Sequence, residues 1–238
     1  PCQDQAVAGW GRTTLGAERL RAAVLAAYAV DLVALDAVAA GADPGARTWR
    51  GRDADGRSWA VRETTGDPRA GLEAAAGVGA PGVPAPARTV DGALCAGVDG
   101  AHVSLVPWVD GPTALAVDPS PDQWRAFGHV LARVHAADPP AGLPRDDHSG
   151  DEVAGYVDAA DRAAAAAVDD LGRETAAEWA AVRPRLVAVL DLVRGYGAVG
   201  ADDAVLCHGD PHRDNLLLDP DGRSVWLIDW DDAMLSWR

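Results

Sequence analysis

The segment VLCHGDPHRDNLLL (residues 205–218) decides the fold of this chain, together with VWLIDWDD (residues 225–232), which follows after a short turn. Sparse polar residues (His, Asp, Asn and a second Asp) lie between short apolar runs. The apolar runs predict strands, and the polar residues predict a loop over residues 208–215. The segment is therefore expected to fold as a strand, a polar loop, a hairpin and an acidic end.

The hairpin is expected from residues 216–218 and 224–228, with DPDG at residues 219–222 as its turn. Proline presets φ for a turn, and glycine accepts a positive φ. Such a hairpin returns Asp229 to the loop that precedes its first strand.

Three oxygen-bearing side chains, those of Asp210, Asn215 and Asp229, can then converge on one point. Hard oxygen ligands of this kind suit Mg²⁺, which proteins usually hold with one or two carboxylates together with substrate phosphates.

Four residues separate Asp210 from Asn215, which is the spacing of the catalytic loop of protein kinases, and Asp229 stands where a metal-binding aspartate follows a hairpin. His-Gly-Asp at 208–210 replaces His-Arg-Asp, and Ile-Asp-Trp at 228–230 replaces Asp-Phe-Gly. The pattern HGDxHxxN followed by IDWD resembles the aminoglycoside phosphotransferase and choline kinase group of small-molecule kinases. An ordinary acidic hairpin would need these residue types to reach these spacings by chance.

The resemblance implies an α+β, two-lobed protein kinase-like fold. We expect an N-terminal nucleotide-binding lobe over residues 1–109, with an antiparallel sheet and a helix. We expect a mainly helical C-terminal lobe over residues 110–238, which carries the catalytic loop and the hairpin. The family usually continues further beyond Asp229 than this chain does, and the chain begins with Pro1, so a truncated or processed form is one interpretation.

The resemblance also implies how the site works. Asp210 would accept a hydrogen bond from the substrate hydroxyl and align it on the γ-phosphorus of ATP or GTP. Asn215 and Asp229 would hold Mg²⁺. His208 would anchor the loop, and His212 would touch phosphate or brace the loop. Positioning and charge neutralisation do most of the work in phosphoryl transfer.

The first half of the chain favours strands. A helix is expected over residues 15–28, with Thr14 as its cap. The dipeptide Asp55-Gly56 is a strong hairpin signal. Strands are expected at residues 32–39, 47–51, 58–63, 93–97 and 102–109.

By resemblance, the loop from Gly41 to Gly45 lies where a kinase folds a glycine-containing loop over the phosphates. Arg62, in WAVR, stands where kinases usually place a lysine. Arginine can bind phosphate bidentately but differs from lysine in geometry and reach. Glu73 stands in an Ala-rich helix where kinases place the glutamate that pairs with this cation. A surface strand residue and a solvent-facing glutamate are the alternatives for Arg62 and Glu73.

The segment PWVDG at residues 107–111 resembles the link between the two lobes of small-molecule kinases. Backbone groups near Val106 to Trp108 would bind the adenine edge there. Trp108 could stack on the base or fill the core. Pro107 removes one N–H donor, which restricts the hydrogen-bond pattern.

Beyond residue 111 the pattern is helical. Capping boxes are expected to begin at Ser120, Ser149 and Thr175, with proline at the first helical position after Ser120. Pro184 lies inside the apolar stripe of the last helix and is expected to kink or divide it. These helices would form much of the wall for the acceptor substrate.

Composition narrows the class of protein. The chain has 238 residues, 48% of them hydrophobic, which is enough for a packed core. No apolar run approaches the roughly 18 residues of a membrane helix, and no signal peptide opens the chain, so we expect a cytoplasmic protein without a membrane partner. Three widely spaced cysteines argue against a disulfide framework.

The net charge of −15 disfavours nucleic acid as a partner. The charge is uneven, since residues 138–178 carry a net charge of −8 (11 acids, 3 Arg) and residues 202–238 carry −6 (9 acids, 3 Arg). An acidic cleft can attract a cationic small molecule, and Asp231 and Asp232 could face one. Solvated helix faces and ordinary exposed acids explain the same pattern.

Two other classes of function compete. Cys207, His208 and His212 could bind zinc, although zinc leaves Asn215 and Asp229 without a role. A kinase-like protein that binds nucleotide without turnover is the other. Within the kinase interpretation, an aminoglycoside-like acceptor is favoured, and choline-like alcohols, homoserine and macrolides remain open. The sequence is compatible with a monomer or a dimer.

Overall fold

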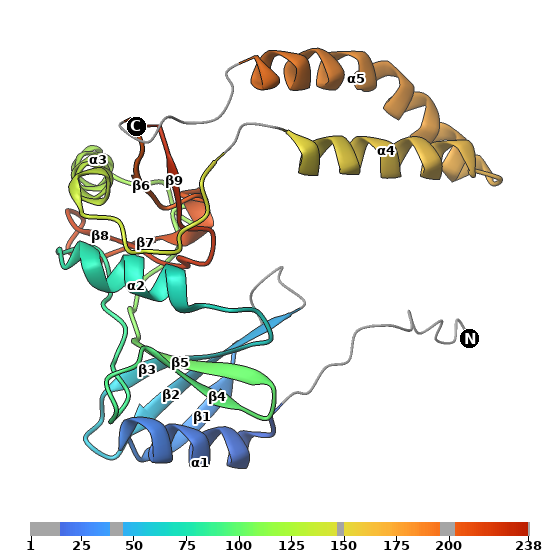
Figure 1. Cartoon of the computed structure of the whole chain (residues 1–238). Coiled ribbons are helices and arrows are strands. Elements are labelled where there is room, and N and C mark those ends of the chain that lie inside the picture. The colour runs from blue at the N-terminus through green and yellow to red at the C-terminus, as the bar shows by residue number, and fades with distance from the viewer. Residues whose placement is uncertain (1–14, 39–44, 147–149, 196–202, 238) are drawn as a thin grey trace. The chain divides into compact units, whose positions relative to one another are not determined.

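Figure 1 shows the computed structural model, which describes residues 15–38, 45–146, 150–195 and 203–237. The chain divides into two compact units, namely Pro1–Leu143 with Val205–Met234 and Pro144–Ala204 with Leu235–Arg238. This division by compactness differs from the expected lobe boundary at residue 109, which stays a prediction.

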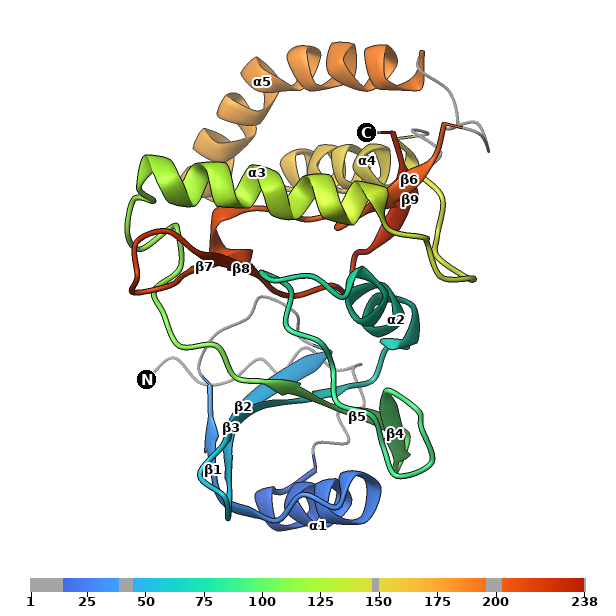
Figure 2. The same cartoon turned by 90° about the vertical axis from the view of Figure 1, so that its left-hand side faces the viewer.

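The first unit contains helix α1 (Ala17–Tyr28) and a five-stranded antiparallel sheet (Figure 2). The strands lie in the order β1-β2-β3-β5-β4. Their bounds are β1 Leu32–Ala37, β2 Ala46–Asp53, β3 Ser58–Thr64, β4 Cys95–Val98 and β5 Ala101–Pro107. The helix, the strands and the turn at Gly56, with its φ of 82°, are confirmed, with shifts only at the ends of elements.

One face of the sheet packs against α1. Val24 of α1, Val61 of β3 and Leu105 of β5 are fully buried in one apolar cluster. Because side chains alternate across a strand, Arg62 lies on the face opposite Val61. The apolar core therefore fixes β3 from one side and leaves Arg62 on the other side for the functional site.

Two further helices belong to this unit. Helix α2 (Arg69–Val78) ends at Gly79, whose φ of 54° is left-handed. Helix α3 (Pro121–Ala136) begins with the expected capping box, since the Ser120 hydroxyl accepts from the Gln123 N–H (3.1 Å) and the Gln123 side chain accepts from the Ser120 N–H (3.0 Å).

The polar loop and the hairpin within residues 205–228 fold as expected. Strand β7 pairs antiparallel with β8, with Leu216 opposite Leu227, and Gly222 in the turn has a φ of 71°. The elements are β6 Val205–Cys207, a 3₁₀ turn at Arg213–Asn215, β7 Leu216–Leu218, β8 Val225–Leu227 and β9 Met234–Ser236.

The second unit is a pair of helices, α4 (Asp151–Ala165) and α5 (Asp170–Arg194), that lie side by side (Figure 1). The Asp161 carboxylate joins them, accepting from the Arg183 Nε (2.8 Å) and from the Trp179 indole N–H (2.8 Å).

The start of α5 corrects one expectation. Thr175 does not cap a helix but lies inside α5, where its hydroxyl donates to the Leu171 carbonyl (3.0 Å). The cap is Asp169, whose carboxylate accepts from the Gly172 N–H (2.7 Å). Asp169 caps the helix because it supplies a charged acceptor six residues earlier, at the actual start of the helix.

Pro184 does not divide α5, which continues through it and bends along its length (Figure 2). The caps expected at Thr14 and Ser149 lie outside the described residues. None of the helices that the structure describes has the length and apolar character of a membrane-spanning segment.

Candidate active site

His208 fastens the polar loop to the end of the hairpin. Its side chain is almost fully buried, and its Nε2 lies 2.9 Å from the Ile228 carbonyl oxygen, so Nε2 carries the proton and donates. The imidazole meets the Trp230 ring edge-on, with centroids 4.8 Å apart. Burial lowers the pKa of His208 below its ordinary value. His208 is therefore a neutral structural anchor, as the resemblance implied.

Gly209 explains why His-Gly-Asp replaces His-Arg-Asp. Its φ is 86°, and a Cβ at this position would overlap the backbone carbonyl oxygen of Asp232. Only glycine allows this close approach. The chain after the hairpin therefore passes directly against the polar loop, a contact that the sequence pattern did not reveal.

The polar groups of the loop fix one oxygen of Asp210 and leave the other open. His212 Nδ1 accepts from the Asp214 N–H (3.0 Å), so the ring proton lies on Nε2, which is 3.2 Å from Asp210 Oδ2. The Asn215 amide nitrogen donates to the Asp210 carbonyl (3.0 Å) and lies 3.4 Å from the same Oδ2. The Asp210 side chain is 46% exposed. Among the residues that the structure describes, none bonds to its Oδ1, which is therefore accessible to a ligand.

Asn215 and Asp229 are brought next to each other by the hairpin. The Ile228 N–H donates to the Asn215 carbonyl (2.9 Å), and Asp229 follows at once with a φ of 63°. A positive φ is costly for a non-glycine residue and is concentrated at functional sites. Because the Asn215 amide nitrogen donates to Asp210, the amide oxygen is the atom of this side chain that could coordinate a cation.

Arg62 reaches the same point from the sheet. Its Nη1 is 2.8 Å from Asp229 Oδ1, and its Nη2 pairs with Asp231 Oδ2. The Arg62 side chain is only 20% exposed. The structure thus brings together Arg62, Asp229 and the loop, as the sequence predicted, and adds Asp231, which the sequence had placed only towards an acceptor.

Glu73 is not brought to Arg62. It is exposed on α2, and within the described part of the chain no ion pair joins it to Arg62. Helix α2 contributes through Gly71 instead, since a Cβ there would overlap the Trp230 carbonyl oxygen. The helix and the hairpin end are therefore in backbone contact.

The segment that we expected to link the two lobes, residues 107–111, makes contacts with the sheet. Val106 pairs with Ala60 on β3, directly along the face that carries Arg62. The Trp108 N–H donates to the Ser58 carbonyl (3.0 Å), and the guanidinium of Arg50 lies over the Trp108 ring, 4.9 Å from its centroid. Neither Pro107, which has no N–H, nor Trp108 therefore offers a backbone donor to a base.

The glycines predicted near the phosphates and the predicted zinc site have different outcomes. Gly45 is described, and its carbonyl accepts from the Thr65 N–H (3.1 Å), whereas Gly41 lies outside the described residues. The zinc site expected from one rival interpretation is not supported, since the residues that the structure describes contain no metal-binding group of three His, Cys, Asp or Glu side chains.

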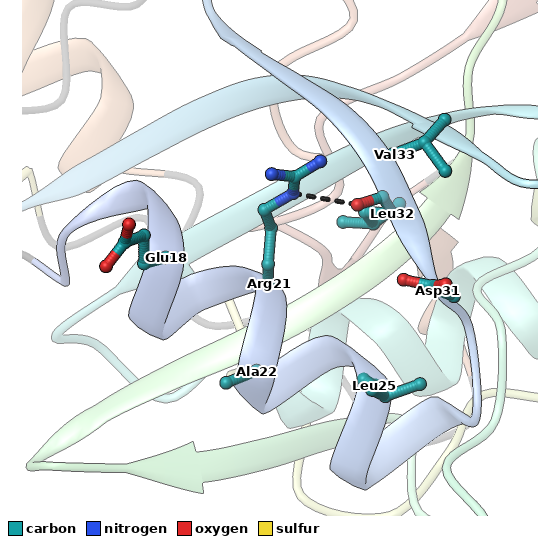
Figure 3. Close-up of a pocket in the computed structure, with 7 residues that line it drawn as sticks. All are labelled: Glu18, Arg21, Ala22, Leu25, Asp31, Leu32 and Val33. Carbon is teal, nitrogen blue, oxygen red and sulfur yellow. Dashed lines mark hydrogen bonds between the residues drawn. The ribbon is translucent and has the colours of Figure 1, made fainter.

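A depression of about 530 Å³ lies elsewhere, between α1 and β1. Figure 3 shows that the Arg21 side chain crosses it and donates to the Leu32 carbonyl (2.7 Å). Its walls include Glu18, Leu25 and Val33, and none of the site residues above. This hollow is on the opposite side of the sheet from Arg62 and belongs to no part of the candidate site.

Comparison with known proteins agrees with the geometry. The model of the phosphotransferase enzyme family, APH, matches residues 52–238. No curated protein sequence shows significant similarity to the chain.

Solved structures share the fold. Spectinomycin phosphotransferase APH(9)-Ia, in complex with ADP and spectinomycin, has a TM-score of 0.78 at 20% identity, over 93% of this chain and 70% of that chain. An aminoglycoside phosphotransferase from Alicyclobacillus acidocaldarius has a TM-score of 0.59 at 18% identity, over 94% and 68%. Macrolide 2'-phosphotransferase MphH from Brachybacterium faecium has a TM-score of 0.51 at 21% identity, over 87% and 70%.

These likenesses establish the kinase-like α+β fold, and the family match covers most of the sequence, including the whole loop and hairpin. The chain belongs to the phosphotransferase enzyme family and is a small-molecule kinase by family and fold.

Proposed function

We propose that this protein transfers the γ-phosphate of ATP to a hydroxyl group of a small, cationic molecule, with an aminoglycoside-like antibiotic as the favoured acceptor class. The observation that carries the proposal is the 2.8 Å contact between Arg62 and Asp229, two residues 167 positions apart. On this proposal the contact would bring a phosphate-binding cation and a metal-binding carboxylate together beside the loop of Asp210.

The nucleotide would bind along the face of the sheet that carries Arg62. Arg62 would neutralise phosphate charge, and the turn at Gly45 would lie near the phosphates. Val106 and Trp108 would lie near the base of the nucleotide, ATP or GTP. On this proposal residues 1–109 form the nucleotide-binding lobe, and residues 110–238 carry the phosphate-transfer loop and the acceptor wall.

The donor set fits Mg²⁺. Asp229 already pairs with a cationic group, the Arg62 guanidinium. The amide oxygen of Asn215 would be available to coordinate a metal ion. Hard oxygen donors with substrate phosphates are the usual surroundings of Mg²⁺. Asn215 and Asp229 would hold the ion, which would neutralise charge on the phosphate oxygens during transfer.

Asp210 would orient the acceptor. His212 and Asn215 both lie against its Oδ2, which supports the proposal that Oδ1 would accept a hydrogen bond from the substrate hydroxyl. This alignment supplies most of what a phosphoryl-transfer enzyme must do. His212 acts here as a brace for Asp210.

The acceptor class rests on charge and on structural relatives. The chain carries a net charge of −15, which favours a cationic molecule near its acidic segments. Structures of the same fold contain spectinomycin or hygromycin B. Macrolides, choline-like alcohols and homoserine are the alternative acceptors.

The test is an ATP-consumption screen with Mg²⁺ over aminoglycosides, macrolides, choline and homoserine, with product detected by mass spectrometry. We expect phosphate transfer to a cationic, hydroxylated acceptor and none with Asp210→Ala. Transfer to a neutral acceptor alone would refute the cationic class. Nucleotide binding without transfer to any acceptor would identify a kinase-like protein without turnover.

A further inference from the structure

We propose that Asp231, rather than the helix residue Glu73, is the residue that positions Arg62 for the nucleotide phosphates. The inference rests on the proposed phosphotransferase function and gives a role to a carboxylate that the function does not otherwise require.

The geometry of Arg62 suggests two simultaneous partners. Its two terminal nitrogens bind separate carboxylates, Nη1 to Asp229 and Nη2 to Asp231. The planar guanidinium presents these donors in a fixed fork, which a lysine ammonium would not. Arginine at this position therefore has a structural reason: it can keep one carboxylate while it exchanges the other.

Asp229 and Asp231 are held at a fixed separation by the residue between them. Trp230 is buried, its indole N–H donates to the Leu227 carbonyl (3.1 Å), and its ring packs against His208. Asp229 and Asp231 are thus the two sequence neighbours of a residue whose side chain is anchored in the core.

Helix α2 supports this arrangement through its backbone. Gly71 lies so close to the Trp230 carbonyl that a Cβ would overlap it, and the Cα of Asp231 lies 3.4 Å from the same position. The helix therefore holds Asp231 in place by packing. The Glu73 side chain, two residues further along the helix, is exposed, and a nearby cation that feels its charge is Arg69.

The two carboxylates have different tasks once a metal–nucleotide complex is bound. Asp229 is required as a metal ligand, so it can no longer be committed to Arg62. Asp231 then remains as the carboxylate that holds the guanidinium at the phosphates. Without Asp231, Arg62 would stay on Asp229 and compete with the metal for that carboxylate.

The experiment compares nucleotide affinities by calorimetry in the presence of Mg²⁺. Wild type, Asp231→Asn, Asp231→Glu and Arg62→Ala are titrated with ATP and with adenosine, which has no phosphate. We expect Asp231→Asn to weaken ATP binding about fivefold to tenfold, as for a charge-assisted hydrogen bond in a partly exposed site. Adenosine binding should not change, and Asp231→Glu should restore part of the ATP affinity.

Two controls separate positioning from general damage. Asp122→Asn removes a carboxylate from an exposed ion pair with Arg125 in the same unit and should leave ATP affinity unchanged. In an Arg62→Ala background, Asp231→Asn should have no further effect on ATP binding, because its effect acts through Arg62.

The outcomes are distinguishable. ATP affinity that is unchanged in Asp231→Asn but weakened in Glu73→Gln would overturn the inference and leave the phosphotransferase proposal intact. Equal weakening by Asp231→Asn with and without Arg62 would also overturn it. A wild-type protein that binds adenosine and ATP equally would refute the proposed function, and the inference with it.

Discussion

The five-stranded sheet and the polar loop of residues 208–215 are held in place by different kinds of contact. The sheet owes its position to a cluster of fully buried apolar side chains against α1, among them Val61 and Leu105. The strands on either side of the polar loop are also buried, at Leu206, Leu216 and Leu227. The loop itself depends on individual polar or glycine residues: His208 on Ile228, Asn215 on Asp210 and Gly209 on Asp232.

The difference has a functional consequence. An apolar core distributes its stabilisation over many contacts, so one lost methyl group changes stability more than geometry. A hydrogen-bonded loop has one group for each task, so one change alters geometry directly. We therefore expect changes in the loop to affect turnover and changes in the sheet to affect stability.

The largest effect is expected at Asp210. Replacing it with Asn removes the acceptor for the substrate hydroxyl while keeping the size of the side chain, so turnover should fall about 10²- to 10⁴-fold. The melting temperature and the affinity for ATP should remain near those of wild type. Steady-state kinetics with the acceptor found in the screen would measure this change in turnover. Retained turnover would contradict the proposed role of Asp210.

Gly209→Ala should be next. The new Cβ would meet the Asp232 carbonyl in a left-handed backbone conformation, with a cost of about 1–3 kcal/mol from the conformation alone and more from the overlap. We expect turnover to collapse even at temperatures where circular dichroism reports a folded protein. Gly97→Ala is the matched control, because a Cβ there meets no atom within 4 Å, and wild-type behaviour of Gly209→Ala would contradict the close approach.

Leu105→Ala should show the opposite balance. Truncating this fully buried side chain should lower the free energy of unfolding by about 2–5 kcal/mol. Turnover per folded molecule should change little at low temperature, because Leu105 faces α1 and not Arg62. Urea unfolding and kinetics at low temperature would be compared. A loss of turnover without a loss of stability would contradict the proposed difference between the sheet and the polar loop.

The smallest effect concerns pH. Because burial lowers the pKa of His208, the unfolded chain takes up a proton before the folded chain does as the pH falls. The stabilisation that comes from keeping His208 neutral is therefore fully present above the ordinary histidine pKa, about 6.5. As the pH falls below this value, the free energy of unfolding decreases by at most about 1.4 kcal/mol per pH unit. Thermal unfolding of wild type between pH 7.5 and 5 should show this slope, and His208→Gln should reduce it. Equal slopes in both proteins would argue against a buried neutral His208.

Much of the fold could be predicted from the sequence. The capping box at Ser120, the hairpin turn at Gly222 and the placement of Arg62 on a strand all follow from local patterns. The convergence of Asn215 with Asp229 also follows, because a short hairpin must return its last residue to the start of its first strand.

Other contacts could not be predicted, because they join residues that are distant in sequence. Nothing local marks Gly71 as a point of contact with Trp230, or Asp231 as a partner of Arg62. The cap at Thr175 failed for a related reason: a capping motif inside a longer helix is overridden by the stronger start at Asp169.

The most direct test of the account is calorimetric titration of ATP into wild type and Asp229→Ala, with and without Mg²⁺. We predict that wild type binds ATP more tightly with Mg²⁺, and that Asp229→Ala loses this dependence on Mg²⁺, with binding at least about tenfold weaker. Asp122→Ala, on the surface of α3, should behave as wild type. Unchanged Mg²⁺-dependent binding by Asp229→Ala would contradict the claim that Arg62, Asp210, Asn215 and Asp229 form one phosphoryl-transfer site.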